Sequence, residues 1–170
     1  MLRIALIKKL FAALNEELAK TKTIGEIGLC GGAVMCLVFQ ARQATKDVDA
    51  IFEPTREIRQ AAKKVAKQFG LEATWLNDAA KAYFHVDPPK EDVLQFSNLR
   101  VWAPKADYML AMKCVAARLD THDKDDIEFL IGYLNLATVQ DVLHVIEKYY
   151  PRSQVPARSQ FLIEELFGEG

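Results

Sequence analysis

The sequence predicts a mixed α/β (α+β) fold, with an α/β half over residues 1–103 and an α-helical half over 104–170, packed as a single structural unit. Residues 27–52 alternate short apolar runs with a glycine pair and a polar break, which is typical of a strand–turn–helix–strand segment. From residue 104 onward, apolar residues recur at helical spacing instead. Hydrophobic residues make up 51% of the chain and charged residues 26%, which supports a buried core and argues against a disordered chain.

Charge and cysteine content narrow the class of protein further. The net charge of −1 provides no bulk electrostatic reason for nucleic-acid binding, although a local basic patch stays open. Basic residues interrupt the first apolar stretch, and glycines and a glutamate interrupt the longest one, so neither a signal peptide nor a membrane span is expected. An odd number of cysteines, all within apolar stretches and without metal-ligand spacing, indicates buried, reduced thiols in a cytoplasmic protein: Cys30, Cys36 and Cys114. The apolar pattern also predicts that the protein has no membrane partner.

Residues 2–20 are predicted to form an amphipathic helix. Its apolar positions recur every three or four residues, with charged residues on the opposite side. Helices that lie on a membrane surface show the same pattern, but Glu16 and Glu17 deprive this one of a strongly cationic face. We therefore expect the helix to pack on the sheet through Leu6, Ile7, Leu10, Phe11, Leu14 and Leu18.

A pair of glycines separates a strand from a helix in the next segment. We predict a strand over residues 27–30, a glycine turn at 31–32 and a helix over 33–40. Residues 42–46 form a polar break, and a second strand covers 47–52.

Two carboxylates stand on the second strand, after the glycine turn. Because successive side chains of a strand alternate between its faces, Asp47 and Asp49 are expected to share one face, where they repel each other unless a cation lies between them. Carboxylate oxygens suit Mg²⁺ or Mn²⁺. Gly31 and Gly32 at the start of a helix let backbone N–H groups approach a phosphate. The segment therefore predicts a site for a metal-bound polyphosphate, although solvated surface carboxylates and an ordinary turn would produce the same pattern.

The G-G-A stretch at 31–33 and the R-x-A-T-x-D-V-D stretch at 42–49 resemble the nucleotidyltransferase superfamily. They are most similar to its small bacterial branch, which includes abortive-infection and type IV toxin-like nucleotidyltransferases. The resemblance implies a nucleotidyltransferase-like mixed sheet with flanking helices. It also implies roles for six residues: Gly31 and Gly32 hold the triphosphate, Asp47 and Asp49 bind the metal, and Arg42 and Thr45 belong to the nucleotide site.

A third helix is predicted from the Pro54-Thr55 turn to Phe69, where Gly70 ends it. Apolar residues of this segment form its inner face. The outer face fits either a nucleic-acid backbone or, more commonly, an ordinary solvated helix surface, because it carries Arg56, Arg59, Lys63, Lys64 and Lys67.

The W-L-N-D stretch at 75–78 indicates a helix start capped by Asn77 or Asp78, and it also resembles the matching segment of the family. His85 stands alone before a loop-like stretch over 87–92 and is expected to be structural or exposed.

Two strands are predicted over residues 93–96 and 99–103, and Pro104 is expected to open the next helix. Two-metal nucleotidyl transfer commonly uses a third carboxylate on a neighbouring strand. Neither of these predicted strands carries an Asp or Glu residue.

Lys113 interrupts the apolar stripe of the helix predicted over residues 104–119. An inward-facing lysine requires an anion nearby, and aspartates follow at positions 120, 123, 125 and 126. We expect Asp126 to be the partner, because it lies beside the inner stripe of a helix over 124–134, which Asp123 caps. The pair either fixes two helices together or lets Lys113 contact a phosphate while Asp126 orients it. The resemblance implies the second role, through a helix lysine and a partly matched K-D-x-x-D-I-like motif.

The remaining chain is predicted to be helical. Thr138 to Asp141 resembles a capping box that starts a helix ending at Tyr150. A last short helix over 157–167 either folds back or docks on another subunit.

These features predict a Mg²⁺-dependent nucleotidyltransferase that moves a nucleoside monophosphate from an NTP to a hydroxyl. The nucleotide would lie between the two halves, with Lys113 neutralising its charge. The acceptor is left open between an RNA end, a protein hydroxyl and a small molecule. The alternative is a catalytically degenerate protein of the same fold that binds nucleotide or a partner, such as an antitoxin. A purely structural domain is a third interpretation, and the toxin role is implied by the resemblance alone.

Overall fold

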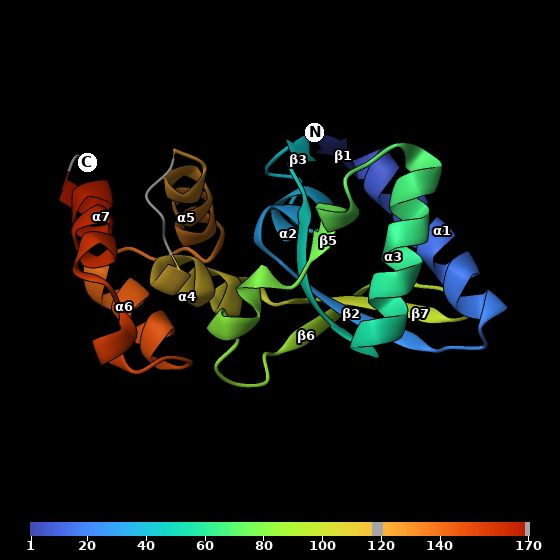
Figure 1. Ribbon diagram of the computed structural model, residues 1–170. Coiled ribbons are helices and arrows are strands. Elements are labelled where there is room, and N and C mark those ends of the chain that lie inside the picture. The colour runs from blue at the N-terminus through green and yellow to red at the C-terminus, as the bar shows by residue number, and fades with distance from the viewer. Residues whose placement is uncertain (117–120, 169–170) are drawn as a thin grey trace. The chain divides into compact units, whose positions relative to one another are not determined.

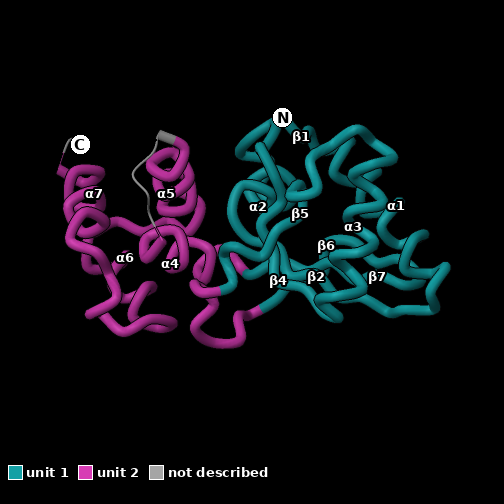
Figure 2. The backbone as a smooth tube through the Cα atoms, in the orientation of Figure 1, with its two compact units in different colours: residues 1–81, 90–104 teal, residues 82–89, 105–170 magenta. Residues whose placement is uncertain are grey.

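The computed structural model describes residues 1–116 and 121–168 (Figure 1). They form the mixed α/β fold that the sequence predicts. The chain divides into two compact units, shown in different colours in Figure 2. We call residues 1–81 with 90–104 the N-terminal unit, and residues 82–89 with 105–170 the helical unit.

The N-terminal unit is built on a five-stranded mixed sheet of order β5-β4-β2-β7-β6, with β1 and β3 paired separately. In the sheet, β2 runs antiparallel to β4 and parallel to β7, β4 is parallel to β5, and β6 is antiparallel to β7. The elements are β1 Leu2–Arg3, α1 Ile4–Lys20, β2 Gly25–Cys30, α2 Gly31–Leu37, β3 Ala44–Thr45, β4 Val48–Glu53, α3 Thr55–Phe69, the 3₁₀ helix η1 Ala73–Trp75, β5 Leu76–Asn77, the 3₁₀ helix η2 Ala79–Tyr83, β6 Lys90–Gln95 and β7 Leu99–Pro104.

Helices α1 and α3 pack side by side and contact strands β7 and β4 of the sheet (Figure 1). All but one of the apolar positions predicted to face the sheet from α1 are fully buried, the exception being Leu6, which is partly exposed. In α3, Ile58 and Val65 are fully buried as well. Gly70 adopts a left-handed conformation with φ +66° and ends α3 as predicted. Trp75 connects the 3₁₀ helix η1 to α3, because its Nε1–H donates to the Ala62 carbonyl at 3.0 Å.

Several predictions about element boundaries were wrong. Helix α2 covers Gly31–Leu37 rather than residues 33–40, so the glycine pair lies inside the helix and not in a separate turn before it. Leu76–Asn77 forms β5 through pairing with β4, and the helical turn after it is the short 3₁₀ helix η2. The predicted cap is confirmed for Asn77, whose Oδ1 atom accepts from the N–H of Ala79 at 3.2 Å. Strand β6 begins at Lys90 rather than at residue 93, because Lys90 pairs with Pro104 across the β6–β7 ladder. Pro104 is therefore the last residue of β7, and the following helix begins at Ala106.

The helical unit contains α4 Ala106–Ala116, α5 Thr121–Tyr133, α6 Val139–Glu147, the 3₁₀ helix η3 Arg152–Gln154 and α7 Ala157–Gly168. Helix α4 packs against α5 and α6, and α6 packs against α7. Ser159 of α7 is fully buried and its hydroxyl donates to the Cys114 carbonyl at 2.5 Å. The last helix therefore folds back onto its own unit, which is one of the two alternatives left by the sequence.

Aromatic side chains connect residues 82–89 to the helices of the helical unit. The Tyr108 hydroxyl donates to the Val86 carbonyl at 3.1 Å, and the Tyr150 hydroxyl donates to the Tyr83 carbonyl. His85 is exposed and stacks on Tyr150, with ring centroids 5.8 Å apart, which is a structural role.

Helix starts in this unit were predicted with mixed success. The capping box at Thr138 and Asp141 is confirmed, because the side chain of each residue accepts a hydrogen bond from the backbone N–H of the other. Helix α6, however, ends at Glu147 rather than at Tyr150. Asp123 lies within the first turn of α5 and does not cap it from outside. Within residues 1–116 and 121–168, none of the helices combines the length and the apolar composition needed to cross a bilayer.

Candidate functional site

The glycine pair begins α2 directly after Cys30, the last residue of β2, and changes the direction of the chain there; we call this junction the β2–α2 turn. Cys30 is extended, with φ −148° and ψ −178°, and Gly31 then turns the chain with φ +62°. This left-handed conformation is readily available to glycine and strained for other residues. The buried residues Ala33, Val34 and Met35 then anchor α2 to the core, so the turn has a defined position above β4.

Gly31 lies directly against one of the predicted metal ligands. A Cβ atom at Gly31 would lie 3.0 Å from Oδ2 of Asp49, closer than an ordinary van der Waals contact. The sheet register explains the proximity, since Cys30 of β2 is paired with Asp49 of β4. The glycine turn and this carboxylate therefore form one site.

Gly32 lies against Arg42 and Thr45, the first and last residues of the R-x-A-T stretch. A Cβ atom at Gly32 would lie 2.5 Å from Oγ1 of Thr45 and 3.2 Å from Nη1 of Arg42. Thr45 is buried, and its hydroxyl donates to the Asp47 carbonyl at 3.2 Å. The hydroxyl of Thr45 thereby fixes the chain where it enters β4.

The alternation predicted for β4 is observed. Val48, Ala50 and Phe52 are buried, whereas Asp47 and Asp49 are partly exposed. Strand β4 begins at Val48, so Asp47 precedes the strand by one residue. The contacts of the two glycines place five of the six predicted site residues of this unit around one turn: Gly31, Gly32, Arg42, Thr45 and Asp49. The sixth, Asp47, is joined to them because its carbonyl accepts from the Thr45 hydroxyl.

The donor set suits a hard cation with open coordination positions. Asp49 and Asp47 offer oxygen ligands at the surface, and Mg²⁺ usually keeps waters and substrate phosphate oxygens beside one or two carboxylates. Among the described side chains, no group of three or more His, Cys, Asp or Glu residues is arranged to hold a metal ion. The remaining ligands of a cation here would therefore be water and substrate oxygens.

The strands beside β4 place other residue types next to Asp49. The register pairs Asp49 with Cys30 on one side and with Asn77 of β5 on the other. The prediction that the two strands now assigned as β6 and β7 carry no acidic residue was wrong, because β6 begins earlier than predicted and includes Glu91 and Asp92. The order β5-β4-β2-β7-β6 separates β6 from β4 by two strands. Asp92 is moreover held by Arg100, which donates from Nε and Nη2 to its Oδ1 atom at 2.9 and 2.8 Å.

The second predicted constellation lies in the helical unit. The Lys113 Nζ atom of α4 lies 2.7 Å from Oδ2 of Asp126 and 3.1 Å from Oδ1 of Asp123, both on α5. The side chains of Lys113 and Asp126 are 11% and 2% exposed. The predicted pair is confirmed, and Asp123 joins it. One ammonium thus stands between two carboxylates, which joins α4 to α5. Asp120 lies outside the described residues.

Sequence reasoning missed a further polar cluster in the helical unit. The Tyr149 hydroxyl donates to Oδ2 of Asp107 at 2.6 Å, and Lys148 lies 3.7 Å from the same atom. Burial, together with the hydrogen bond to Asp107, raises the pKa of Tyr149 above its ordinary value. Asp107 and Tyr149 are 42 positions apart, so no local pattern in the sequence could indicate this contact.

Comparison of the chain with protein-family models, with curated proteins and with solved structures found no match. The nucleotidyltransferase resemblance stays a prediction carried by the motifs, and the residues of the β2–α2 turn are the basis for any proposal about function.

Proposed function

We propose that this protein is a metal-dependent nucleotidyltransferase that moves a nucleoside monophosphate from an NTP to a hydroxyl acceptor. The observation that carries the proposal is the contact between the glycine turn and the carboxylate, where a Cβ atom at Gly31 would lie 3.0 Å from Asp49 Oδ2. A glycine backbone beside a partly exposed carboxylate suits a ligand that bears both phosphate oxygens and a bound cation.

Each residue around the turn has a distinct part in this proposal. Asp47 and Asp49 would hold Mg²⁺ or Mn²⁺, which supplies charge stabilisation to the phosphate oxygens when bound. Gly31 and Gly32 would offer the backbone N–H groups at the start of α2 to the β- and γ-phosphates. Arg42, whose Nη1 atom would lie 3.2 Å from a Cβ at Gly32, contributes a permanent positive charge. Positioning and charge stabilisation are the main contributions that phosphoryl and nucleotidyl transfer require of a protein.

Thr45 has a positioning role in this arrangement. It is buried and donates to the Asp47 carbonyl, so it holds the backbone that carries Asp47. Because Gly32 lies against Thr45, the same residue also limits how far the glycine turn can move. The predicted role of Thr45 in the nucleotide site is therefore indirect in our proposal.

The role of Lys113 is assigned differently from the expectation drawn from the resemblance. Its ammonium already has two carboxylate partners at 2.7 and 3.1 Å, and a phosphate would have to compete with both. We therefore assign Lys113 and Asp126 to holding α4 against α5. This is the alternative that the sequence left open, and it requires no contact with the nucleotide.

A second candidate function is nucleotide binding without transfer. The specific observation in its favour is that Asp49 is flanked by Cys30 and Asn77 on its neighbouring strands. Neither residue is a strong general base for activating a hydroxyl at neutral pH, whereas a carboxylate at such a position commonly serves this purpose.

The proposal is tested by calorimetric titration of the protein with Mg²⁺ and a non-hydrolysable NTP. We expect binding by the wild type that requires Mg²⁺ and is lost in Asp47→Asn/Asp49→Asn. Glu53→Gln/Glu91→Gln is the matched control, because it removes two exposed carboxylates from strands of the same sheet. Equal binding by all three proteins would refute the site.

Transfer of label from an α-labelled NTP to RNA, protein or small hydroxyl compounds then separates the two functions. Label transfer that is lost in Asp47→Asn supports the enzyme. Binding without transfer to any class of acceptor supports the second candidate, and an Asn77→Asp variant would show whether a third carboxylate restores chemistry.

A further inference from the structure

Helix α3 has two sharply different faces. The apolar residues pack inward, and Ile58 and Val65 are fully buried. The basic residues recur every three or four positions, which places them on the opposite side of the helix, and each of them is exposed. We call this set the basic stripe: Arg56, Arg59, Lys63, Lys64 and Lys67.

Charge is segregated onto this part of the molecule. Residues 1–22 and 55–69, which contain α1 and α3, hold ten Lys and Arg residues against three Glu residues. Their formal charge is +7, whereas the whole chain carries −1 and the remainder therefore carries −8. Since α1 and α3 pack side by side, these cations share one layer of the N-terminal unit (Figure 1). A separation this large creates a local positive field that the net charge conceals.

The spacing of the basic stripe favours a linear polyanion. A rise of 1.5 Å per helical residue places Arg59, Lys63 and Lys67 about 6 Å apart in turn, and the whole stripe is about 16 Å long. Neighbouring cations therefore lie within the Debye length of about 8 Å at physiological ionic strength, so their fields reinforce one another.

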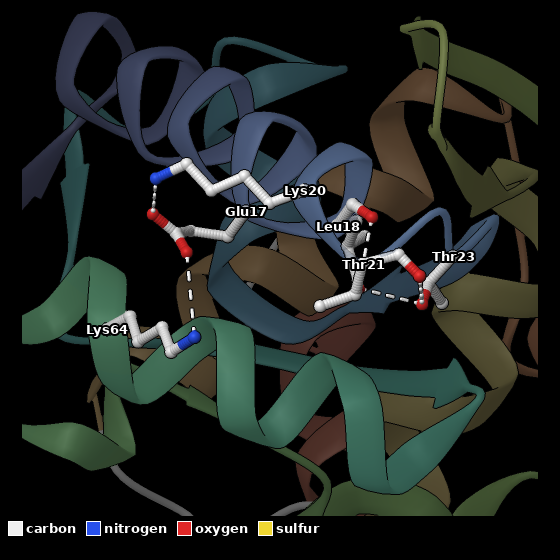
Figure 3. Close-up of polar contacts among 6 residues, drawn as sticks. All are labelled: Glu17, Leu18, Lys20, Thr21, Thr23 and Lys64. Atoms are coloured by element: carbon white, nitrogen blue, oxygen red, sulfur yellow. Dashed lines mark hydrogen bonds and ion pairs between the residues drawn. The ribbon is translucent and has the colours of Figure 1, made fainter.

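Glu17 connects the basic stripe to α1. It lies between Lys20 of its own helix, at 2.7 Å, and Lys64 of α3, at 4.0 Å (Figure 3). Its side chain is only 14% exposed, whereas those of Lys20 and Lys64 are 69% and 66% exposed. The ammonium groups thus remain at the surface and continue the positive charge from one helix to the next. At the far side, Arg59 is steadied by Asp78 at 2.6 Å.

Helix α3 itself exposes no large apolar side chain that could anchor a bilayer or a folded protein partner. An interfacial helix inserts apolar residues into the membrane, but the apolar residues of α3 are buried in the core. Protein interfaces depend on aromatic or aliphatic anchors, and the exposed residues of α3 outside the basic stripe are Gln60 and Gln68. The basic stripe therefore offers a partner mainly positive charge, and a phosphodiester backbone is a partner that binds through charge.

We propose that the basic stripe binds the phosphodiester backbone of a nucleic acid. The lysines and arginines contact phosphates and read no base, so binding is independent of sequence and steeply dependent on salt. The inference does not rest on the proposed transfer activity, because the basic stripe consists of residues outside the β2–α2 turn.

The experiment measures fluorescence anisotropy of labelled 20-nucleotide RNA and DNA of the same sequence, with the full chain, in the absence of NTP, between 50 and 200 mM salt. Five phosphate contacts on a single strand predict that the wild type loses about 100-fold in affinity across this range, whereas Lys63→Gln/Lys67→Gln loses about 20-fold. Gln is as good a helix former as Lys, so the variant should fold, which circular dichroism confirms. Binding of Mg²⁺ and NTP should be unchanged in this variant, and nucleic-acid binding should be unchanged in Asp47→Asn/Asp49→Asn.

The matched control is Lys81→Gln/Lys105→Gln, which removes two exposed lysines elsewhere. An equal loss in both double variants would overturn the proposal, because bulk charge would then explain the binding. Failure of the wild type to bind either strand at 50 mM salt would overturn it too. Equal binding of RNA and DNA supports recognition of the backbone alone, and preference for RNA supports additional contact with the 2′-hydroxyl. Tighter association with vesicles of phosphatidylserine and phosphatidylcholine than with either strand would assign the surface to a membrane instead.

Discussion

Asp49 lies so close to Gly31 that a Cβ atom on Gly31 would come within 3.0 Å of its Oδ2 atom. The two residues belong to different elements, and the pairing of Cys30 with Asp49 across β2 and β4 brings them together. A backbone turn without side chains therefore lies against a partly exposed carboxylate. This relationship makes the glycine turn part of the candidate site and not only a connection between a strand and a helix.

Gly31→Ala should destabilise the protein and abolish binding of Mg²⁺ and NTP. The left-handed backbone at φ +62° costs a non-glycine residue about 1–2 kcal/mol, and the new methyl group must also displace Asp49. Gly70→Ala is the matched control, since Gly70 has φ +66° but nothing within 4 Å of its Cβ position. Urea denaturation should show a larger loss for Gly31→Ala than for Gly70→Ala. Equal losses, with ligand binding retained, would separate Gly31 from the site.

Gly32→Ala should be destabilising because of Thr45. A Cβ at Gly32 would approach the buried Thr45 Oγ1 to 2.5 Å, and overpacking of this kind costs about 1–3 kcal/mol. Thr45→Ala removes that atom, together with its hydrogen bond to Asp47, so the double variant should be more stable than the sum of the single losses predicts. The free energies of unfolding of the four proteins measure this coupling. Strict additivity of the losses in Gly32→Ala and Thr45→Ala would contradict the prediction. Gly132→Ala is the control and should be neutral or stabilising, because no atom lies within 4 Å of the Cβ position of Gly132.

Local patterns in the sequence predicted those parts of the molecule whose causes are local. Helix α3 has a regular apolar face and ends at a left-handed glycine, so its bounds were predicted correctly, and of the apolar residues expected on its inner face all but Phe69, which is partly exposed, are buried. The capping box of Thr138 and Asp141 needs only four consecutive residues. Lys113 was matched to Asp126 because an inward lysine requires a nearby anion, and the contact is observed at 2.7 Å.

The errors concern features that depend on distant partners. Leu76–Asn77 is a strand because it pairs with β4, and two residues carry no recognisable strand pattern. Strand β6 begins at Lys90, within a stretch of charged residues, because Pro104 lies opposite it. The contact between Asp107 and Tyr149 joins helix α4 to the residues that follow α6, 42 positions further along the chain. In each case the determining interaction is tertiary, and propensity is overridden.

Lys113→Met should be strongly destabilising. It leaves Asp126, which is 2% exposed, and Asp123 without their cation, and breaking a buried ion pair costs about 3–5 kcal/mol. Lys113→Met/Asp126→Asn should recover part of the loss, since it removes the buried charge. Lys124→Met is the control, because its pair with Glu165 is exposed and should contribute less than about 1 kcal/mol. If thermal denaturation shows similar small losses for both lysines, Lys113 does not hold the helices together and a phosphate-binding role gains support.

The Cys114 thiol should be unreactive in the folded protein. Burial raises its pKa to about 12 from the ordinary value of 9.0, so the reactive thiolate is absent near neutral pH. Between these two values the unfolded chain has lost this proton and the folded chain keeps it. Stability from this group is therefore fully present below pH 9 and declines as the pH rises towards 12. Ellman's reagent at pH 8 should label Cys114 only after denaturation. Cys114→Ala should reduce the alkaline slope of the free energy of unfolding by up to about 1.4 kcal/mol per pH unit, and an unchanged slope would contradict the assignment.

Glu17→Gln should strengthen nucleic-acid binding by the basic stripe. Glu17 is the carboxylate between Lys20 and Lys64, and its neutralisation removes an anion that competes with phosphates for both ammonium groups. For a single strand, each added phosphate contact steepens the dependence of log affinity on log salt by about 0.7, so the gain should be largest at 50 mM salt. Glu164→Gln, an exposed glutamate on α7, changes the net charge by the same amount and serves as the control. Only an effect confined to Glu17→Gln is consistent with a local surface, because a rise of equal size in both variants would mean that the nucleic acid responds to the charge of the whole protein.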